Sequence, residues 1–560
     1  MSRFARSTRG TAHSSNKLTR FGMKVALAMA VSICFHASTA QADLLVNGDF
    51  NLDADASGGP DGWVNWGYGP TSFSAYKADP ANDPFDFDGT PYVNAGNYGD
   101  WWSSGGGWYQ EVPFAGAEGT PFSFKAFGAT EDWDNAAGEL RIIYLGEANA
   151  ELQRDVRHSA SYQANKPWSL VELTSVAPAG TLVVKVEFAT WGARGAVLWD
   201  QGSLNTASVW NVDDAGDSAE PGNWIGGAPG GVDAAARFLG KITANRTVVV
   251  DSPLTLGSIS FANTNSYVMA GTSTLRLETT SGSAFVDVQS GTHRINLQLT
   301  IASDTYLSVA DGAVLEIGDP VTVAAGRSVK PSGSGTIVYQ SSMTLEPNAS
   351  IVFAGNTRLT SLTLDSGSSV LVAAHLSAPA RILAVESLAA APGSTINLSD
   401  NSMLVDYSGA SPIGDLINAF LDGTIVVNPD VAGLPTTLAI SEAADLGATE
   451  FGTFSVDESA VLLRYTYVGD ANLDGQVDAL DYERVDLAIG NSGVFGVAQG
   501  DLNYDGNVDA LDYEQIDLNI GNGVGAPLAS VTGGIFIPEP TGLLVLVVSS
   551  GLLGRRRRIK

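Results

Sequence analysis

The sequence predicts a mainly β protein. It would have an N-terminal β-sandwich of the jelly-roll type, a central parallel β-helix or solenoid, and a small all-α module near the C-terminus. The chain has 63 glycines and only 16% charged residues, a composition that favours short strands and tight turns over helices. All eleven tryptophans lie at or before Trp224, which indicates a change of domain. An acidic pattern that begins at Asp470 recurs at Asp501, and helical spacing follows each copy.

Residues 1–42 have the features of a signal peptide. A basic region, residues 3–24, precedes a short apolar run, residues 25–35, and small residues at 40–42 permit cleavage. A membrane anchor is the alternative, but the apolar run covers only about half a bilayer. The only cysteine, Cys34, lies in this segment, so the mature chain is predicted to lack disulfides and thiolate metal sites.

The formal net charge of the chain is −30, and many of its basic residues lie in the two terminal segments. A chain this acidic repels nucleic acids and anionic surfaces. The charge therefore argues against DNA and RNA binding, and much of the acidity is consistent with simple solubility outside the cell.

Residues 43–205 are predicted to form the jelly-roll sandwich, because strand-like runs recur there without helical periodicity. Three short segments, residues 45–50, 108–112 and 197–200, are similar to the carbohydrate-binding jelly rolls of bacterial polysaccharide-degrading enzymes. The resemblance implies that this domain binds an extracellular polysaccharide.

Tryptophans are the candidate glycan-binding residues, since aromatic faces suit the apolar side of a sugar ring. Burial in the sandwich core is the alternative for several of them. The candidates are Trp66, Trp101, Trp102 and Trp108, and the pair at 101–102 ranks first because its Gly- and Ser-rich setting is typical of a loop. The same resemblance implies one further calcium ion held by Asp49 and Asp200, for which ordinary surface acids are the alternative.

Residues 206–400 are predicted to form the β-helix or solenoid. Short apolar runs such as 254–261 and 295–301 alternate with Gly, Ser, Asn and Asp, and each is too short for a helix. This rhythm resembles a right-handed parallel β-helix, and the opening at Trp210 and Trp224 resembles autotransporter passenger repeats. Further antiparallel sandwiches are the alternative.

Residues 401–467 are predicted to form a capping β unit with one helix at 413–421. The last coil of a β-helix leaves an open edge, so a terminal unit that differs from the coils is expected.

The pattern with the clearest chemistry is the duplicated acidic loop at 470–481 and 501–512. Calcium prefers six to eight oxygens at about 2.3–2.6 Å, and an EF-hand loop supplies them from positions 1, 3, 5, 7, 9 and 12. Position 6 must turn sharply, and Gly475 and Gly506 stand there. The predicted ligands of two calcium ions are Asp470, Asn472, Asp474, Gln476, Asp478 and Asp481 in the first loop, and Asp501, Asn503, Asp505, Asn507, Asp509 and Asp512 in the second.

Residues 468–523 resemble a type I dockerin, a pair of half EF-hands that are each followed by a helix. Position 12 is Asp in both copies, where an EF-hand usually has Glu. Helical spacing follows each loop: Tyr482, Val485 and Ile489 are predicted to lie on one face of a helix, as are Tyr513, Ile516 and Ile520. The resemblance implies a cohesin-like partner, although dockerin-like modules without a cohesin are the alternative. The predicted partner-binding residues, at loop positions 10 and 11, are Ala479, Leu480, Ala510 and Leu511.

The C-terminal end has the features of a second sorting signal. After a linker at 524–537, Pro538-Glu539-Pro540 precedes an apolar stretch, residues 541–554, and four arginines. This order resembles the PEP-CTERM signal of bacterial exported proteins over residues 538–560. The resemblance implies a short transmembrane segment and a membrane sorting protease, so the chain is predicted at the cell surface, associated with the outer membrane, or extracellular after processing. A simple C-terminal anchor is the alternative.

Two functions are compatible with this organisation. The first is a secreted or cell-surface non-catalytic protein that binds calcium through the dockerin-like module and glycan through the N-terminal domain. The second is a polysaccharide-degrading subunit, a glycoside hydrolase or lyase, with the same accessory modules. The predicted mature chain has three scattered histidines, His158, His293 and His375, and few basic residues in its middle, which favours a protein that is not an enzyme. A glycosidase, however, needs only two carboxylates.

Overall fold

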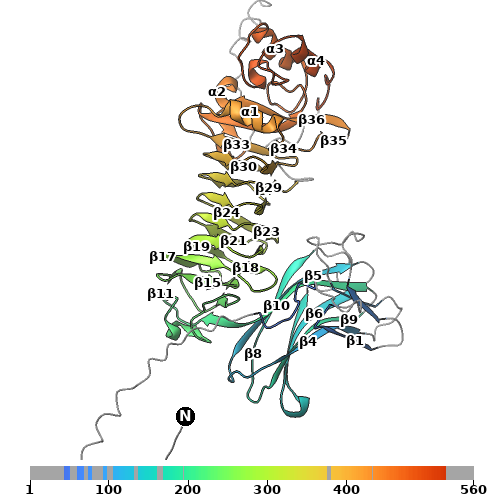
Figure 1. The fold of residues 1–560 in the computed structure, drawn as a ribbon, viewed down its shortest axis with the longest axis vertical. Coiled ribbons are helices and arrows are strands. Elements are labelled where there is room, and N and C mark those ends of the chain that lie inside the picture. Colours follow the sequence, from blue (N-terminus) through green and yellow to red (C-terminus); the bar gives the residue numbers. More distant parts are fainter. Residues whose placement is uncertain are drawn as a thin grey trace, which may run out of the picture. The chain divides into compact units, whose positions relative to one another are not determined.

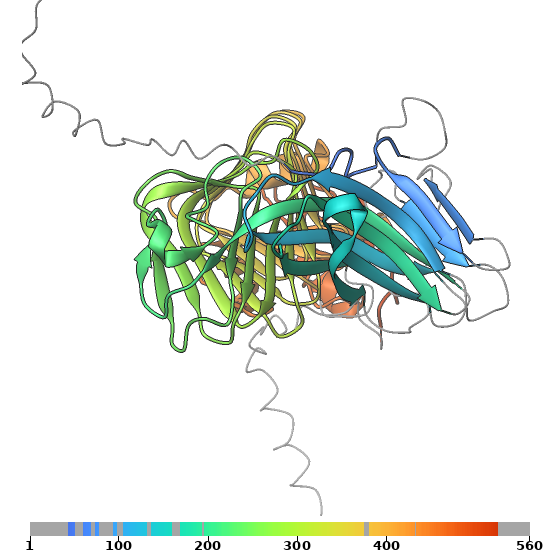
Figure 2. The same ribbon diagram turned by 90° about the horizontal axis from the view of Figure 1, so that it is seen from below.

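The computed structural model describes residues 43–50, 60–68, 73–77, 93–97, 105–131, 136–159, 168–192, 195–374, 380–431 and 433–524 (Figures 1 and 2). The predicted signal peptide, the tryptophan pair at 101–102, His375 and the C-terminal sorting signal lie outside these residues. None of the described helices combines the length and the hydropathy needed to cross a membrane.

Two antiparallel layers form an N-terminal sandwich, which confirms the predicted architecture. One layer, here named the outer sheet, has the strand order β1–β4–β9–β6–β7. In the other layer β10 pairs with β3 and β5, β3 with β2, and β5 with β8. The core between the layers holds Trp108, Phe122, Phe188 and Trp199. The strands are β1 (Val64–Tyr68), β2 (Phe73–Lys77), β3 (Val93–Asn97), β4 (Gly105–Pro113), β5 (Pro121–Glu131), β6 (Ala136–Leu145), β7 (Glu151–Ser159), β8 (Ser169–Val176), β9 (Val183–Gly192) and β10 (Gly195–Trp210).

Strand β10 belongs to both the sandwich and the solenoid. It has 16 residues. Residues 196–206 pair with β5 in antiparallel fashion, and residues 207–209 pair with β13 in parallel fashion. The two regions therefore share a continuous backbone ladder.

Parallel strands stacked coil upon coil build the middle of the chain (Figure 1). In one register row Leu299, Val321, Met343, Leu362 and Leu388 pair in succession. Apolar side chains at such positions form one continuous core. This arrangement confirms the β-solenoid and rules out antiparallel sandwiches for this region.

The solenoid strands form three ladders. The first continues from β10 through β13 (Ala235–Phe238), β16 (Ser258–Ala262), β18 (Ala284–Ser290), β20 (Thr305–Val309), β23 (Ser328–Ser332), β26 (Ser350–Phe353), β29 (Ser369–Val372) and β32 (Thr395–Asn397) to β34 (Ile425–Val426). The second runs through β11 (Gly216–Asp217), β14 (Arg246–Val249), β17 (Tyr267–Leu277), β19 (Thr292–Ile301), β22 (Val321–Val323), β25 (Met343–Leu345), β28 (Leu362–Leu364) and β31 (Leu388–Ala390), with β15 (Leu254–Leu256), β21 (Val314–Ile317) and β24 (Thr336–Tyr339) beside it. The third has β27 (Thr357–Leu359), β30 (Ile382–Val385) and β33 (Ser402–Asp406), and the short β12 (Trp224–Ile225) pairs with β10.

An antiparallel unit closes the solenoid, here named the cap. Strand β33 pairs with β30 in parallel fashion and with β39 (Ala460–Tyr467) in antiparallel fashion, and β36 (Leu434–Glu442) pairs with β39. Helix α1 (Ile413–Leu421) stands where the sequence predicted a helix. The change from parallel to antiparallel pairing ends the stack of coils. The remaining elements are β35 (Asp430–Val431), α2 (Ala443–Leu446), β37 (Glu450–Phe451) and β38 (Phe454–Ser455).

Two short helices, α3 (Ala479–Ala488) and α4 (Ala510–Asp517), follow the two acidic loops as predicted. Val485 and Ile516 lie in a small core shared by the two repeats. Tyr482 and Tyr513 pack against this core, as the predicted faces require, but Ile489 and Ile520 do not belong to them, because each helix ends before its isoleucine and each isoleucine is 51% exposed.

Candidate functional site

The two acidic loops have the same internal geometry. At position 1, Asp470 Oδ1 accepts a hydrogen bond from the Asp474 N–H at 3.1 Å, and its Oδ2 accepts one from the Gly475 N–H at 2.8 Å. In the second loop Asp501 accepts the corresponding bonds from Asp505 and Gly506, both at 3.1 Å. The backbone thus folds around the first aspartate of each loop.

Position 12 closes each loop by hydrogen bonds to backbone N–H groups. Asp481 Oδ1 accepts from Ala471 at 2.8 Å and from Asn472 at 3.1 Å, and Oδ2 accepts from Asp478 at 2.8 Å. Asp512 makes the equivalent contacts with residues 502, 503 and 509. A short Asp side chain at this position therefore draws the loop tightly together.

Position 9 has a role that the sequence analysis missed. Asp478 and Asp509 are the N-caps of α3 and α4, and each accepts the N–H two residues on at 2.8 Å. With Asp481 and Asp512 they form capping boxes, which stabilise helix starts. The signal was present in the sequence as an Asp followed three residues later by another Asp.

The backbone of each loop turns sharply at position 6, where Gly475 has φ +88° and Gly506 has φ +83°. At position 4, Leu473 and Tyr504 also adopt positive φ, of 61° and 64°. Both position-4 side chains pack against the cap.

The two repeats are paired through a pseudo-two-fold arrangement of backbone hydrogen bonds. Val477 of the first loop bonds with residues 521 and 522 after α4, and Val508 of the second loop bonds with residues 490 and 491 after α3, over 2.8–3.0 Å. Each loop is therefore joined by backbone hydrogen bonds to the end of the other repeat.

Burial raises the pKa of Asp470 to about 6, of Asp481 to about 7 and of Asp501 to about 6, although hydrogen bonds from N–H groups oppose the shift. Repulsion from neighbouring aspartates adds to it. Within the described chain no three His, Cys, Asp or Glu side chains form a group that could hold a metal by themselves. An EF-type loop does not need one, because it also uses an Asn side chain, a backbone carbonyl and water. The all-oxygen donor set and the desolvated carboxylates fit a calcium ion.

The predicted partner-binding residues all lie on the surface. Leu480 is 56% exposed and Leu511 is 51% exposed, and Ala479 and Ala510 beside them are exposed as well. The module also presents apolar residues that the sequence analysis missed: Leu487 is 76% exposed and Leu518 is 73% exposed. Each follows its loop leucine by seven residues, a helical spacing that the sequence already contained.

One face of the outer sheet carries aromatic and ionic side chains, of which Arg141 and Glu187 are buried and the others partly exposed. The Arg141 guanidinium lies 5.6 Å from the Trp66 ring centroid and pairs with Glu187 at 3.1 Å. Lys185 Nζ lies 3.8 Å from the Tyr109 ring centroid and pairs with Glu187 at 2.9 Å. Of these residues only Trp66 was predicted as a glycan-binding residue from the sequence. The alternation of side chains along one strand does not reveal which side chains of neighbouring strands meet.

Two other predictions for the sandwich concern Trp108 as a sugar-binding residue and Asp49 with Asp200 as calcium ligands. Trp108 is 2% exposed in the sandwich core, so it offers no ring face to a sugar and the prediction for it was wrong. Asp200 is buried and its Oδ1 accepts the Gln201 N–H at 2.7 Å, while Asp49 lies at a polar pocket of about 340 Å³ with Asp304 and Arg327.

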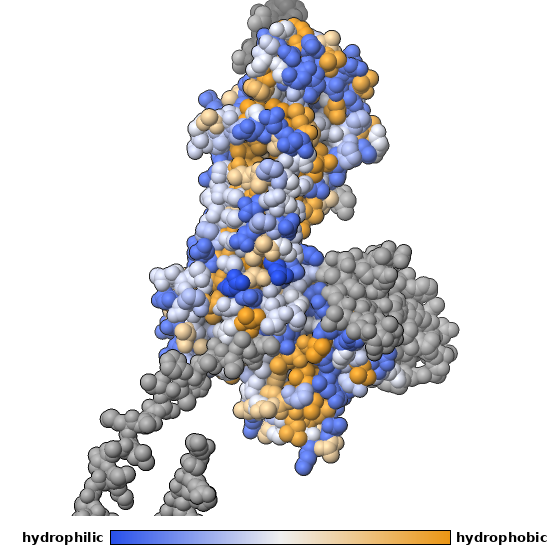
Figure 3. Space-filling view, in the orientation of Figure 1, coloured by the Kyte–Doolittle hydropathy of each residue, from blue (hydrophilic) through white to orange (hydrophobic). Residues whose placement is uncertain are grey.

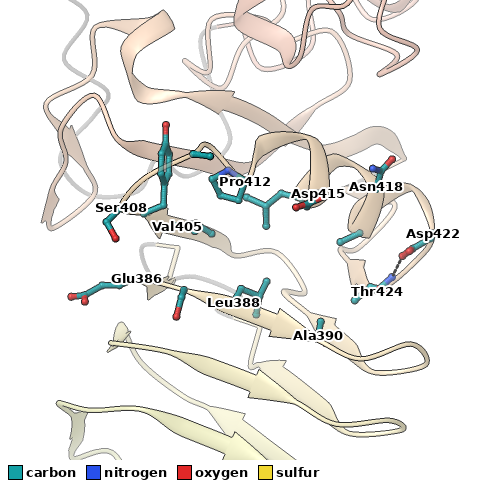
Figure 4. A pocket seen from close by; sticks show the side chains of 15 residues that line it. Glu386, Leu388, Ala390, Val405, Ser408, Pro412, Asp415, Asn418, Asp422 and Thr424 are labelled. Carbon is teal, nitrogen blue, oxygen red and sulfur yellow. Dashed lines mark hydrogen bonds between the residues drawn. The ribbon is translucent and has the colours of Figure 1, made fainter.

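A pocket of about 420 Å³ lies between β31 and α1 (Figure 4). Its lining combines the apolar side chains of Leu388 and Leu416 with the carboxylates of Glu386, Asp415 and Asp422. It contains none of the residues that the sequence analysis named, and we assign it no part in function.

Residues 468–521 match the family model of the dockerin type I domain, which supports the resemblance predicted for this segment. No curated protein matches the chain. Among solved structures, the N-terminal endo-1,4-β-D-xylanase 10B of Clostridium thermocellum with its CBM22-1 and GH10 modules matches at 15% identity, with 31% of this chain, 33% of that chain and a TM-score of 0.23. The present chain thus spans about a third of the xylanase.

Two further solved structures match the same share of the chain. The CBM22-1 xylan-binding domain from Paenibacillus barcinonensis Xyn10C has 12% identity, with 30% of this chain, 96% of that chain and a TM-score of 0.23. A Stig cyclase from Fischerella sp. TAU has 13% identity, with 30% of this chain, 98% of that chain and a TM-score of 0.23. Similarities at this level do not indicate a function, and the matched structures include both a binding domain and an enzyme.

Proposed function

We propose that this chain is an exported, non-catalytic protein that binds calcium and a cohesin-like partner through its C-terminal module and binds polysaccharide through its N-terminal sandwich. The observation that carries the proposal is the duplicated loop and helix at 470–488 and 501–517. The loop geometry repeats, and so does the pair of exposed leucines, one at position 11 of each loop and one seven residues beyond it.

Calcium would be held by the oxygens at loop positions 1, 3, 5, 7, 9 and 12. The ion supplies positive charge that offsets the repulsion among buried aspartates and fixes each loop in its closed form. Side chains of the chain itself also stabilise the closed loops. Asp481 and Asp512 accept hydrogen bonds that close their loops, and Asp478 and Asp509 cap the helices that follow.

The partner would bind the exposed leucines of the two repeats. Leu480 and Leu487 lie on α3, Leu511 lies on α4, and Leu518 directly follows α4. Exposed apolar side chains grouped in this way are typical of a protein interface. Because the repeats are related by a pseudo-two-fold arrangement, the same partner face would fit either leucine pair.

Glycan binding would use the outer face of the sandwich. Trp66 and Tyr109 offer partly exposed aromatic rings, and Lys185 offers a partly exposed ammonium group. The buried Arg141 and Glu187 hold these side chains in place by a cation–π contact and an ion pair. A sugar needs both an apolar ring face and directed polar contacts. The loop tryptophans Trp101 and Trp102 remain part of this proposal, as does one calcium ion near Asp49 and Asp200.

Export would depend on the two terminal signals. The segment 1–42 would direct secretion, and residues 538–560, as a PEP-CTERM-like signal with a short transmembrane stretch, would be processed by a membrane sorting protease. The protein would then be released or attached at the cell surface.

One observation favours the enzymatic alternative, a polysaccharide-degrading subunit. Glu172 and Asp287 lie together at a pocket of about 390 Å³, and the Gln289 amide bridges them at 2.9 and 2.8 Å. Two carboxylates with different pKa values are what a glycosidase requires. Glu172 is also ion-paired with Lys125 and Arg237, which equally fits a structural role. Release of reducing sugar that disappears in Asp287→Asn, a variant expected to keep the fold, would support the enzyme.

Surface plasmon resonance with immobilised type I cohesins tests the partner proposal. We expect binding in CaCl₂ and none in EGTA. The double variant Leu480→Ala/Leu511→Ala should weaken binding at least tenfold, a loss of about 1.4 kcal/mol, while either single variant changes it little because the other repeat remains.

Leu152→Ala is the matched control, since Leu152 is 43% exposed on the sandwich. Cohesin binding that is unaffected by EGTA, or that survives the double variant, would contradict the proposed interface. A glycan array with the same protein tests the sandwich independently, and Trp66→Ala should remove its signal.

A further inference from the structure

The two predicted calcium loops differ in the side chains that precede them in the sequence and donate hydrogen bonds to them. Strand β39 ends just before the first loop and carries Arg464, which is 4% exposed, and Thr466, which is fully buried. Arg464 Nη1 donates a hydrogen bond to the carbonyl oxygen of Leu473, at position 4 of the loop. The Thr466 hydroxyl donates to Oδ2 of Asp470, at position 1. The cap thus holds the first loop by two side-chain hydrogen bonds.

The second loop has no such support. The residues 31 positions after Arg464 and Thr466 are Phe495 and Val497, which carry neither a charge nor a hydroxyl group. In the described chain the Asp501 carboxylate accepts its hydrogen bonds from the backbone N–H groups of Asp505 and Gly506, with no side-chain donor among them. The second loop is anchored to the cap instead by Tyr504, which contributes no charge.

Arg464 is a buried cation that faces the ligands of the first loop. Burial lowers its pKa, and the charges of Asp470 and Asp474 oppose that shift. Its Nη2 is buried and has no hydrogen-bond partner in the described chain. The guanidinium therefore partly balances the aspartates at loop positions 1 and 5.

We propose that Arg464 is a fixed counter-charge of the first calcium loop, so that this loop keeps its fold without calcium and binds calcium more weakly than the second loop. The inference rests on the proposed calcium function and assigns unequal roles to two sites of almost identical sequence. The first site would be preformed and weak, and the second would be tight and would order only with the ion.

The size of the effect follows from electrostatics. A univalent cation fixed about 10 Å from a divalent ion, at an effective dielectric constant near 20, weakens binding by roughly two orders of magnitude, and solvent screening leaves at least about tenfold of this because Arg464 is buried. We therefore expect the two dissociation constants to differ at least tenfold. Removal of the Arg464 charge should bring them within about threefold.

Isothermal titration calorimetry of the chain from residue 43 onward with CaCl₂ tests the proposal. Asp474→Asn and Asp505→Asn, at position 5 of each loop, assign the two sites. Arg464→Met should tighten the first site and leave the second unchanged, while Arg464→Lys, which retains the charge, should keep the first site weak. Arg294→Met is the matched control for charge removal, since Arg294 lies on the solenoid with a side chain 49% exposed.

The outcomes separate the inference from the function on which it rests. Calcium uptake at neither site overturns the proposed calcium function. Equal sites in the unmodified chain, or an Arg464→Met variant whose first site is unchanged or weaker, overturn only the role of Arg464.

A second measurement does not depend on the variants folding. Hydrogen exchange of the unmodified chain in EGTA should leave the amides of Asp474 and Gly475 protected, while those of Asp505 and Gly506 exchange quickly. Equal protection of the two loops in EGTA would contradict the proposal even if calorimetry of the Arg464 variants failed.

Discussion

Tyr504 ties the calcium module to the cap, and its hydroxyl group gives the most direct test of that contact. The side chain lies in the second loop, and its hydroxyl accepts a hydrogen bond from the Ile440 N–H and donates one to the Leu438 carbonyl, both at 2.8 Å. These two backbone groups belong to β36. The replacement Tyr504→Phe keeps the ring, which packs edge-on against Phe420 at 6.1 Å, and removes only the hydroxyl.

The loss can be estimated from the two groups left behind. A buried N–H or C=O that loses its partner costs about 1–3 kcal/mol, but water entering along the strand edge recovers part of this. We expect Tyr504→Phe to destabilise the C-terminal module by about 2 kcal/mol. Tyr482→Phe is the matched control, because the Tyr482 hydroxyl bonds to Asp517 at an exposed position and should contribute less than about 1 kcal/mol.

Differential scanning calorimetry of the chain in CaCl₂ measures both variants. The transition that contains the module should move to lower temperature in Tyr504→Phe and stay nearly in place in Tyr482→Phe. Hydrogen exchange should report faster exchange at the Ile440 amide in the first variant alone. Equal behaviour of the two variants would show that the hydroxyl does not join the module to the cap.

Two further predictions concern the buried carboxylates between the sandwich and the solenoid. Burial alone would raise the pKa of Glu172, but the charges of Lys125 and Arg237 outweigh burial and hold the pKa at about 2. The ionised carboxylate therefore stabilises the fold at pH values above its unfolded pKa of about 4.5. This stabilisation is lost as the pH falls toward 2. Glu172→Gln should cost about 3 kcal/mol in urea unfolding at pH 7 and much less at pH 3, and a loss that does not depend on pH would contradict the ion pair. Burial, and then the charge of Glu172, raises the pKa of Asp287 to about 6, so ionisation destabilises the fold as the pH rises from 3.8 through 6. Asp287→Asn should raise the melting temperature at pH 8 and leave it unchanged at pH 4, and a lower melting temperature at pH 8 would refute this account.

The calcium loops and the solenoid could be predicted because their chemistry is local in sequence. Oxygen-bearing residues at fixed positions and a glycine at position 6 specify a loop by themselves. The short apolar runs of the solenoid predict stacked strands by themselves, and this prediction does not require the order in which the coils stack. The helix at 413–421 could be predicted for the same reason, since its apolar spacing lies within one short segment.

The features that the sequence did not reveal depend on contacts between distant segments. Trp108 was a plausible sugar platform by residue type, but the pleat of β4 turns it into the core. Tyr109, its neighbour, faces the other way and meets Lys185 from β9. The docking of Leu473 and Tyr504 on the cap, and the approach of Arg464 to the first loop, follow from how β36 and β39 pair. No spacing rule gives those contacts.

Equilibrium dialysis of the chain from residue 43 onward against CaCl₂ tests the central claim most directly, because it counts the ions bound per molecule. We expect two calcium ions in the unmodified chain and one in Asp505→Asn, and circular dichroism in EGTA should show a loss of helix from the C-terminal module. A chain that takes up no calcium at these loops, and gives the same spectrum in calcium and in EGTA, would contradict the account.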